Sequence, residues 1–276
     1  MSNDHKSILS RWRKRNLVEE PIATPRRAEE RASVLSQPRR VQPVQTTASS
    51  STSSSKAKVI LVMNSKGGSG KTTVSTNLAT QLSARRRDHK VVLVDHDPQG
   101  SSARWLRARS KRHRLIEGIF PAKDNVIKFK RTWRVLVDTD ATHVIVDSAA
   151  GLSSFDLTDR IRESDLIIVP VMPSAIDIAA TSDFVSKVFI NPAYVKSNKK
   201  MAVVANGVNK GMHNFEKLER FLFSLRIPFI SVFSDHSHYL VAAERGCGVN
   251  ELPVMRQPFH DLPEWDKLIE WVEEVS

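Results

Sequence analysis

The sequence predicts an α/β protein with a mostly parallel, twisted sheet that carries helices on both faces. Short apolar segments alternate along the chain with amphipathic segments of helical length, which is typical of a parallel sheet buried on both sides. One apolar segment runs directly into a glycine-rich turn that opens a helix. Hydrophobic residues make up 40% of the 276 positions, which is enough for a sizeable core.

The first 57 residues are expected to be a disordered basic tail, and residues 58–276 the folded domain. Four prolines between Pro21 and Pro43 interrupt any helix interior, and residues 46–55 form a Ser/Thr-rich linker. Only residues 7–17 could make a short helix there, with apolar and basic side chains combined. A solvated tail is the plain interpretation. An arm that contacts a partner protein, DNA or a membrane is the alternative.

From position 58 the elements follow one another in order. Residues 59–63 form an apolar strand, and Val74, Leu78 and Leu82 place an apolar stripe on a helix over 72–83. Apolar runs predict further strands over residues 91–94, 114–119, 143–146, 166–169, 201–205 and 229–233. The signal over 114–119 is weak, and the strand over 166–169 is expected to end at Pro170. Amphipathic spacing predicts helices over residues 101–109, 178–189, 215–225, 239–245 and 262–275.

The strongest motif is the glycine-rich turn between the first strand and the first helix. It reads Lys66-Gly67-Gly68-Ser69-Gly70-Lys71-Thr72-Thr73. Glycines let the backbone approach an anion closely, and successive amides at a helix N-terminus can surround a phosphate. We therefore expect a phosphate loop in which Lys71 reaches the β- and γ-phosphates of a nucleotide and the Thr72 hydroxyl binds Mg²⁺.

This loop departs from the usual pattern, because Ser65 stands where a glycine is common and a second lysine, Lys66, follows it. The form K-G-G-x-G-K-T-T resembles the deviant Walker A box of the ParA/MinD family of P-loop ATPases. The resemblance implies that ATP and Mg²⁺ are the cofactors. It also implies that Lys66 reaches the nucleotide of a partner subunit, so that ATP closes a homodimer.

Two carboxylates follow the next strand, in Asp95-His96-Asp97-Pro98-Gln99-Gly100. Side chains two residues apart at a strand end point the same way, and the carboxyl ends of parallel strands face the ligand. If this strand lies beside the phosphate-loop strand, both acids come near the γ-phosphate. The segment resembles the family's D-x-D-P-Q-G box, which implies that Asp97 orients the attacking water and Asp95 supports the Mg²⁺ shell.

A third acid, Asp147, ends the apolar strand over 143–146 in a Walker B arrangement, in which the carboxylate holds Mg²⁺ directly or through water. The family's usual proline after this acid is missing here. Residues 169–178 resemble the family again, most of all its McdA-like branch, which positions carboxysomes and other large cargo. By the same resemblance, Asn206 matches the position that hydrogen-bonds adenine.

Charge is distributed unevenly along the chain, whose net charge is +12. Residues 1–57 carry +6 and residues 85–134 carry +10, whereas residues 135–276 carry −7. A polyanionic partner is expected, and non-specific DNA comes first. The basic residues of the early segment that could bind DNA include Arg85, Arg86, Arg87, Arg104, Arg107, Arg109, Lys111, Arg112 and Arg114. A later candidate set is Lys196, Lys199, Lys200, Lys210, Lys217, Arg220 and Arg226.

Several classes of protein are excluded or disfavoured. The single cysteine, Cys247, rules out a disulfide framework and a cysteine-held metal cluster within one chain. No apolar run reaches the length of a membrane span. The predicted last helix is acidic, with Lys267 as its only basic residue, so it should not bind an anionic membrane as the basic C-terminal helix of MinD-like relatives does.

Together these observations predict a cytoplasmic, nucleoid-associated ATPase with slow turnover. It would dimerise on ATP, bind DNA non-specifically, and partition or position a cargo such as a plasmid, a chromosome region or a protein assembly. A ParB-like or McdB-like adaptor would stimulate hydrolysis. The alternatives are a metabolic P-loop enzyme that couples ATP to a small-molecule reaction, and an ATP-gated regulator with negligible turnover.

Overall fold

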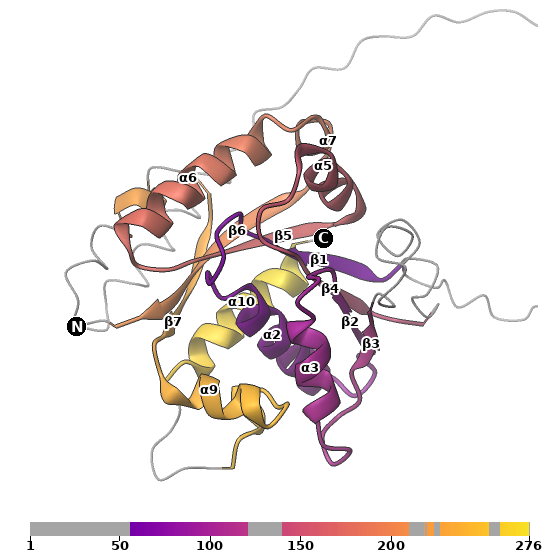
Figure 1. Cartoon of the computed structure of the whole chain (residues 1–276). Coiled ribbons are helices and arrows are strands. Elements are labelled where there is room, and N and C mark those ends of the chain that lie inside the picture. The colour runs from indigo at the N-terminus through magenta and orange to yellow at the C-terminus, as the bar shows by residue number, and fades with distance from the viewer. Residues whose placement is uncertain are drawn as a thin grey trace, which may run out of the picture. The chain divides into compact units, whose positions relative to one another are not determined.

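Seven parallel strands form one sheet in the order β3-β2-β4-β1-β5-β6-β7 (Figure 1). The computed structural model describes residues 56–120, 140–209, 218, 220–223, 227–253 and 260–275. Its strands are β1 (Lys58–Val62), β2 (Val91–Asp95), β3 (Glu117–Ile119), β4 (His143–Asp147), β5 (Leu166–Val171), β6 (Lys200–Val208) and β7 (Phe229–Ser234). The predicted parallel sheet is therefore confirmed.

Helices cover both faces of this sheet, as predicted (Figure 1). They are α2 (Lys71–Arg85), α3 (Ser101–Ala108), α5 (Ser154–Glu163), α6 (Ala175–Phe189), α7 (Pro192–Val195), α9 (Ser237–Glu244) and α10 (Leu262–Glu274), with a 3-10 turn η2 (Val249–Glu251). Of the helix expected over 215–225, residues 218 and 220–223 are described and are helical. The expected tail, up to residue 55, lies outside the described residues.

Strand alternation divides the core into two layers. In β1, Val59 and Leu61 join the apolar cluster under α5 and α6, whereas Ile60 and Val62 join the cluster under α2, α3, α9 and α10. Successive strand side chains point to opposite faces, so each apolar strand supplies both layers. Trp265 of α10 is fully buried and stacks on Phe233 of β7 with 4.0 Å between ring centroids. Such a pair is worth about 1 kcal/mol beyond its buried area.

Helices α5 and α7 and the end of strand β5 differ from the sequence expectation. Neither helix was predicted, although Ser153 caps α5 by accepting the Asp156 amide. Strand β5 continues past Pro170 to Val171. Pairing of β5 with β1 stops at Ile168, so Pro170 is bordered by β6 on one side only. A residue without an N–H is tolerated at such a position. No described helix has the length and apolar character that a membrane crossing requires.

Candidate functional site

The glycine-rich loop lies at the carboxyl end of β1, in the centre of the sheet, and leads into α2 (Figure 1). A methyl group on Gly67 or Gly68 would meet no atom within 4 Å, so the loop is open on that side. Gly70 caps α2 with φ +92°, and a Cβ there would lie 1.9 Å from the Asn206 amide nitrogen. The first turn of α2 has neither an acidic residue nor a side-chain cap. Its amides can therefore bind an anion.

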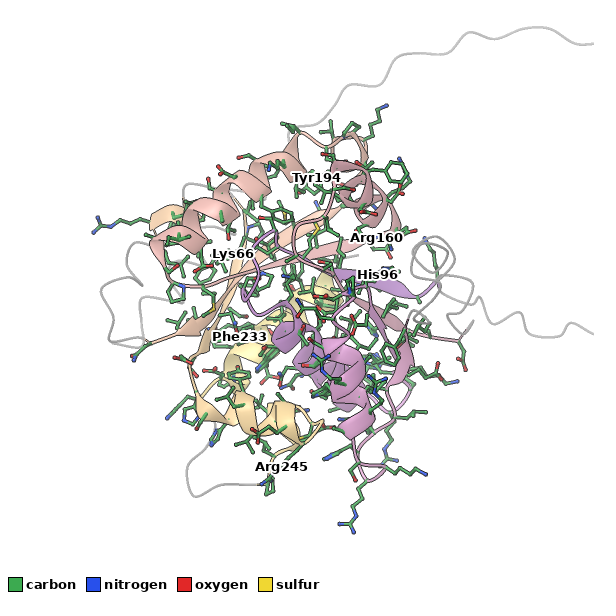
Figure 2. All side chains as sticks on the ribbon, in the orientation of Figure 1. Lys66, His96, Arg160, Tyr194, Phe233 and Arg245 are labelled. Atoms are coloured by element: carbon green, nitrogen blue, oxygen red, sulfur yellow. The ribbon has the colours of Figure 1, made fainter. Side chains whose placement is uncertain are left out.

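The two lysines of the loop lie in opposite environments. The Lys71 ammonium donates to the Lys66 carbonyl over 3.1 Å, and Lys71 is only 7% exposed. Burial lowers the pKa of Lys71, and the carboxylates Asp147 and Asp97 partly offset that effect. Lys66 is half-buried, and within the described part of the chain its ammonium has no hydrogen-bond or ion-pair partner (Figure 2).

Asp147 is fully buried at the end of β4 and gathers hydroxyl groups from two helices. It accepts from Thr72 over 2.8 Å, from Ser75 over 3.3 Å and from Ser102 of α3. Burial raises the pKa of Asp147 to about 6, although the bonds from Ser102 and Thr72 oppose the rise. A carboxylate beside a threonine hydroxyl gives the hard oxygen ligands that Mg²⁺ prefers, so these residues fit that ion.

The other two acids lie at the end of β2 and in the loop after it, but β2 does not lie beside β1. Strand β4 separates them, and Asp95 is the register neighbour of Asp147. Asp95 is completely buried and accepts the amides of Asp97 over 2.9 Å and Ala103 over 3.0 Å. Asp97 is half-buried, accepts the Gln99 amide, and is close enough to act on the pKa of Lys71. Asp95 therefore shapes the loop that presents Asp97.

Asn206 lies inside β6, at a shift in its pairing with β7, rather than after the strand as expected. Its amide nitrogen is 3.4 Å from the Ser69 carbonyl and 3.6 Å from the Met172 sulfur. The Ser69 hydroxyl is buried and, among the described residues, has no hydrogen-bond partner. Thr73 is half-buried in the first turn of α2. Asn206 and Ser69 thus border one end of the loop, with a polar group left for a ligand.

Sequence reasoning missed three residues that act at the site through others. Ser75 and Ser102 hold Asp147, and no sequence signal singles them out. Arg160 of α5 is buried and lies 3.0 Å from the Nε2 atom of His96, which separates the two acids after β2 (Figure 2). An arginine can only donate, so Nε2 accepts and the ring proton sits on Nδ1. Arg160 thereby links α5 to the loop that carries Asp97.

The assembled residues suit a phosphorylated ligand with a divalent cation. Backbone amides, Lys66 and Lys71 offer positive charge, and Thr72 and Asp147 offer oxygen ligands. Among the described residues no group of three or more His, Cys, Asp or Glu side chains could hold a metal ion. A cation here would therefore complete its shell with phosphate oxygens and water, as Mg²⁺ does in nucleotide sites.

One family model matches this chain over residues 60–246, and its description is the CobQ/CobB/MinD/ParA nucleotide binding domain. Two curated relatives are called maintenance of carboxysome distribution protein A. The protein of Gloeobacter kilaueensis is 33% identical over 47% of this chain and 56% of its own length. The protein of Halothiobacillus neapolitanus is 33% identical over 48% and 59%. The chain thus spans somewhat more than half the length of these relatives.

The fold is also that of solved structures in the same group. A complex of a Cyanothece McdA variant with ATP superposes with a TM-score of 0.57 at 15% identity, over 80% of this chain and 96% of that one. At this identity the likeness concerns the fold.

Proposed function

Because the chain belongs to the CobQ/CobB/MinD/ParA family of nucleotide-binding domains, we propose that it is a ParA-type ATPase that works as a positioning switch. It binds ATP, dimerises around it, associates with nucleoid DNA without sequence preference, and distributes a cargo. The observation that carries this proposal is Lys66, whose ammonium lies in the phosphate loop and has no partner within the described part of its own chain.

The different environments of the Lys66 and Lys71 ammonium groups support a second subunit at the site. Lys71 points back onto its own loop and is nearly buried, so it serves the phosphates of its own chain. A second lysine beside it would place two positive charges on one phosphate group, and one suffices in ordinary phosphate loops. An ammonium left available at the open side of the loop suits a phosphate that arrives with another copy.

The remaining residues divide the work on the nucleotide. The backbone from Gly67 to Thr73 binds phosphate oxygens, and Thr72 and Asp147 hold Mg²⁺, which neutralises the developing negative charge. Asp97 orients water at the γ-phosphate, and Asp95 fixes the loop that presents it. Asn206 contacts the adenine.

Cargo and adaptor are proposed from the relatives' names. Two relatives named for carboxysome distribution favour a protein assembly as cargo over a plasmid or chromosome region. A ParB-like or McdB-like partner would then stimulate a slow basal hydrolysis, because a switch must persist in its ATP state long enough to act.

A metabolic P-loop enzyme is the second candidate, and one structural feature favours it. A pocket of about 350 Å³ opens beside Thr72 and Thr73 and is lined further by residues of α3 and α9 such as Arg104, Trp105 and Tyr239. A pocket of this size could take a small substrate. That enzyme would bind its substrate and would show no affinity for DNA.

DNA binding in different nucleotide states separates these functions. We expect the full chain to bind a random-sequence duplex with ATP and Mg²⁺, far less with ADP or no nucleotide, and with an affinity that falls steeply as salt rises. Lys71→Ala should lose the ATP-dependent part, whereas Asp97→Asn should keep it and slow hydrolysis. Binding that ignores the nucleotide, in both the wild type and Lys71→Ala, would contradict the switch.

A further inference from the structure

Resting on the proposed function, we propose that duplex DNA binds to one exposed basic face at the end of α3. This α3 basic face consists of Arg104 and Arg107 on the helix, Lys111 and Arg112 in the loop after it, and Arg245 at the end of α9. All five side chains are exposed, and Arg104 also donates to the Gln99 carbonyl and to the Ser101 hydroxyl. The sequence alone left two basic sets open, and the structure separates the residues that are free to meet a partner from those that are not.

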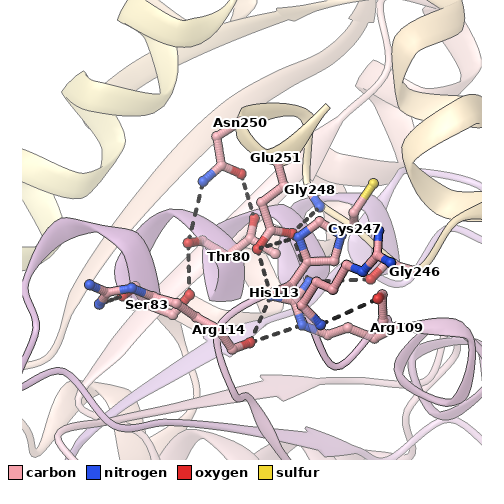
Figure 3. Close-up of polar contacts among 12 residues, drawn as sticks. Thr80, Ser83, Arg109, His113, Arg114, Gly246, Cys247, Gly248, Asn250 and Glu251 are labelled. Atoms are coloured by element: carbon pink, nitrogen blue, oxygen red, sulfur yellow. Dashed lines mark hydrogen bonds and ion pairs between the residues drawn. The ribbon is translucent and has the colours of Figure 1, made fainter. Parts of the chain in front are cut away.

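Two arginines of the early set are used inside the protein. The side chain of Arg109 is only 5% exposed and binds Glu251 through two nitrogens, over 2.6 and 2.7 Å (Figure 3). Arg114 donates to the carbonyls of Ser83 and Arg86. Arg109 is therefore not available to a phosphate backbone, and the exposed Arg114 is held against its own loop through one of its nitrogens.

These internal contacts make the face rigid. The Trp105 indole donates to the Cys247 carbonyl over 3.3 Å, and Arg109 lies over the Trp105 ring at 5.4 Å. A methyl group on Gly246 would come within 2.4 Å of the Arg109 amide, so the end of α9 touches the end of α3 (Figure 3). The backbone at Arg245 is therefore held beside α3, so that the main chain of the face needs no rearrangement when a ligand binds.

The composition of the face suits phosphates rather than a membrane. Residues 101–116 contain no acidic side chain, and Glu244 is the exposed acid on the neighbouring turn of α9. Between Ser101 and Arg114 the structure shows no exposed large apolar side chain, and the nearest ones in sequence to the basic residues are two single leucines, Leu115 after the loop and Leu240 on α9. A membrane-binding segment needs apolar residues that insert among the lipids, whereas non-specific DNA binding rests on Lys and Arg contacts to phosphates.

The same helix also reaches the nucleotide site. In its first turn, Ser102 donates to Asp147 and the Ala103 amide donates to Asp95. A ligand that changes the surroundings of Asp147 therefore acts directly on the helix that carries Arg104 and Arg107. Dimerisation adds a second copy of the face to one particle, which raises the affinity for a long duplex without new contacts.

The later basic set offers a matched control. The Lys199 ammonium is bound to the carbonyls of Arg162 and Ser164, while Lys196 and Lys200 are exposed. Lys187 of α6, which is not in that set, is also exposed. Lys210, Lys217 and Arg226 lie outside the described residues. Replacing three exposed lysines of this region removes the same net charge as replacing three residues of the α3 basic face.

The test compares two triple variants of the full chain on a random-sequence duplex with ATP and Mg²⁺ over a salt series. The α3 variant carries Arg107→Ala, Lys111→Ala and Arg112→Ala, and the control carries Lys187→Ala, Lys196→Ala and Lys200→Ala. We expect the α3 variant to lose at least about tenfold in affinity and its log–log salt slope to fall by about 2 to 3, whereas the control stays within about threefold.

Melting curves and ATP binding show whether each variant is folded, and Arg107→Lys, which keeps the charge, should retain binding. Equal losses in both variants, or a loss confined to the control, would overturn the proposal. If the wild type binds phosphatidylserine vesicles but no DNA, and the α3 variant loses the vesicle binding, the α3 basic face binds a membrane and the proposal is overturned. Wild-type protein that dimerises on ATP yet binds no DNA would overturn this inference and the DNA part of the proposed function, but leave the ATP switch standing.

Discussion

Lys66 and Lys71 lie five residues apart in the same loop and have different proposed roles, one toward a partner's nucleotide and one toward the nucleotide of its own chain. Both carry the same ammonium, but Lys71 is enclosed by its loop and by two carboxylates, while Lys66 faces no described partner. The sequence indicated both lysines because their spacing around the glycines is distinctive. It could not indicate Ser75 and Ser102, because serines are common and only the fold brings them to Asp147.

Between pH 4 and pH 6.5, the buried groups His143 and Asp147 should change the stability of the folded chain in opposite directions. His143 starts β4 and is 7% exposed, and its burial, with His89 and Lys58 nearby, lowers its pKa from 6.5 to about 4. The unfolded chain takes up the His143 proton first as the pH falls, so this group removes stability between pH 6.5 and pH 4. The loss from His143 amounts to about 3 kcal/mol. Asp147, whose pKa burial raises to about 6, takes up its proton first in the folded chain and adds stability over the lower part of the same range.

Urea unfolding at a series of pH values checks this expectation. On going from pH 6.5 to pH 4, the unfolding free energy of His143→Gln should change more favourably than that of the wild type, by about 3 kcal/mol, because only the His143 contribution is removed. His260→Gln, at an exposed position, should follow the wild type. The same slope in His143→Gln and the wild type would show that other groups cause the acid sensitivity.

At the scale of elements, periodicity predicted most of the strands and helices, because buried parallel strands are short apolar runs. The errors of the prediction concern single elements. Helix α5 escaped notice although Ser153, Asp156, Leu157 and Ile161 carry a cap and an apolar stripe, because its polar residues outnumber its apolar ones. Pro170 suggested a strand end, but whether a missing N–H matters depends on which neighbour strand is present.

The contact between α9 and α3 should depend on the lack of a side chain at Gly246. Gly246 and Gly151 both have φ above +60°, at +62° and +64°. A Cβ on Gly246 would meet backbone atoms of α3 and its cap at 2.4 to 2.6 Å, whereas a Cβ on Gly151 would meet nothing within 4 Å. Both alanine variants should lose about 1 to 2 kcal/mol of unfolding free energy, because alanine disfavours a left-handed backbone conformation. Only Gly246→Ala should lose about 1 to 3 kcal/mol more through the clash.

Denaturant midpoints of the two variants give the comparison directly. Gly246→Ala should be the less stable of the pair, by the cost of the clash. If Gly151→Ala is destabilised equally or more, the close packing of α9 on α3 is not what holds the α3 basic face.

At the scale of the whole molecule, the sequence predicted a sheet but not its strand order. Nothing in the segments over 91–94 and 143–146 shows which of them pairs with β1, because both are short apolar runs that end in Asp. The structure places β4 between β1 and β2, and this brings Asp147 next to the phosphate loop and turns Asp95 toward backbone amides. The division of labour among the acids follows from this order.

Removal of residues 1–53 should leave the domain intact. All described helices and strands lie within residues 54–276, which group together as one unit. We expect the truncated chain to melt within about 2 °C of the full chain in calorimetry, a shift that corresponds to less than about 1 kcal/mol in a domain of this size. A fall of many degrees would mean that the N-terminal segment contributes to the stability of the domain.

The molar mass of the protein in solution, measured by light scattering with ATP and Mg²⁺, with ADP and without nucleotide, tests the switch most directly. The wild type should double in mass only in the sample with ATP and Mg²⁺. Lys71→Ala should bind no nucleotide and remain a monomer. Lys66→Ala should still bind ATP and yet remain at the mass of one chain. A Lys66→Ala variant that dimerises on ATP like the wild type, or a wild type that binds ATP and stays single, would contradict the assignment of Lys66 to a partner's nucleotide.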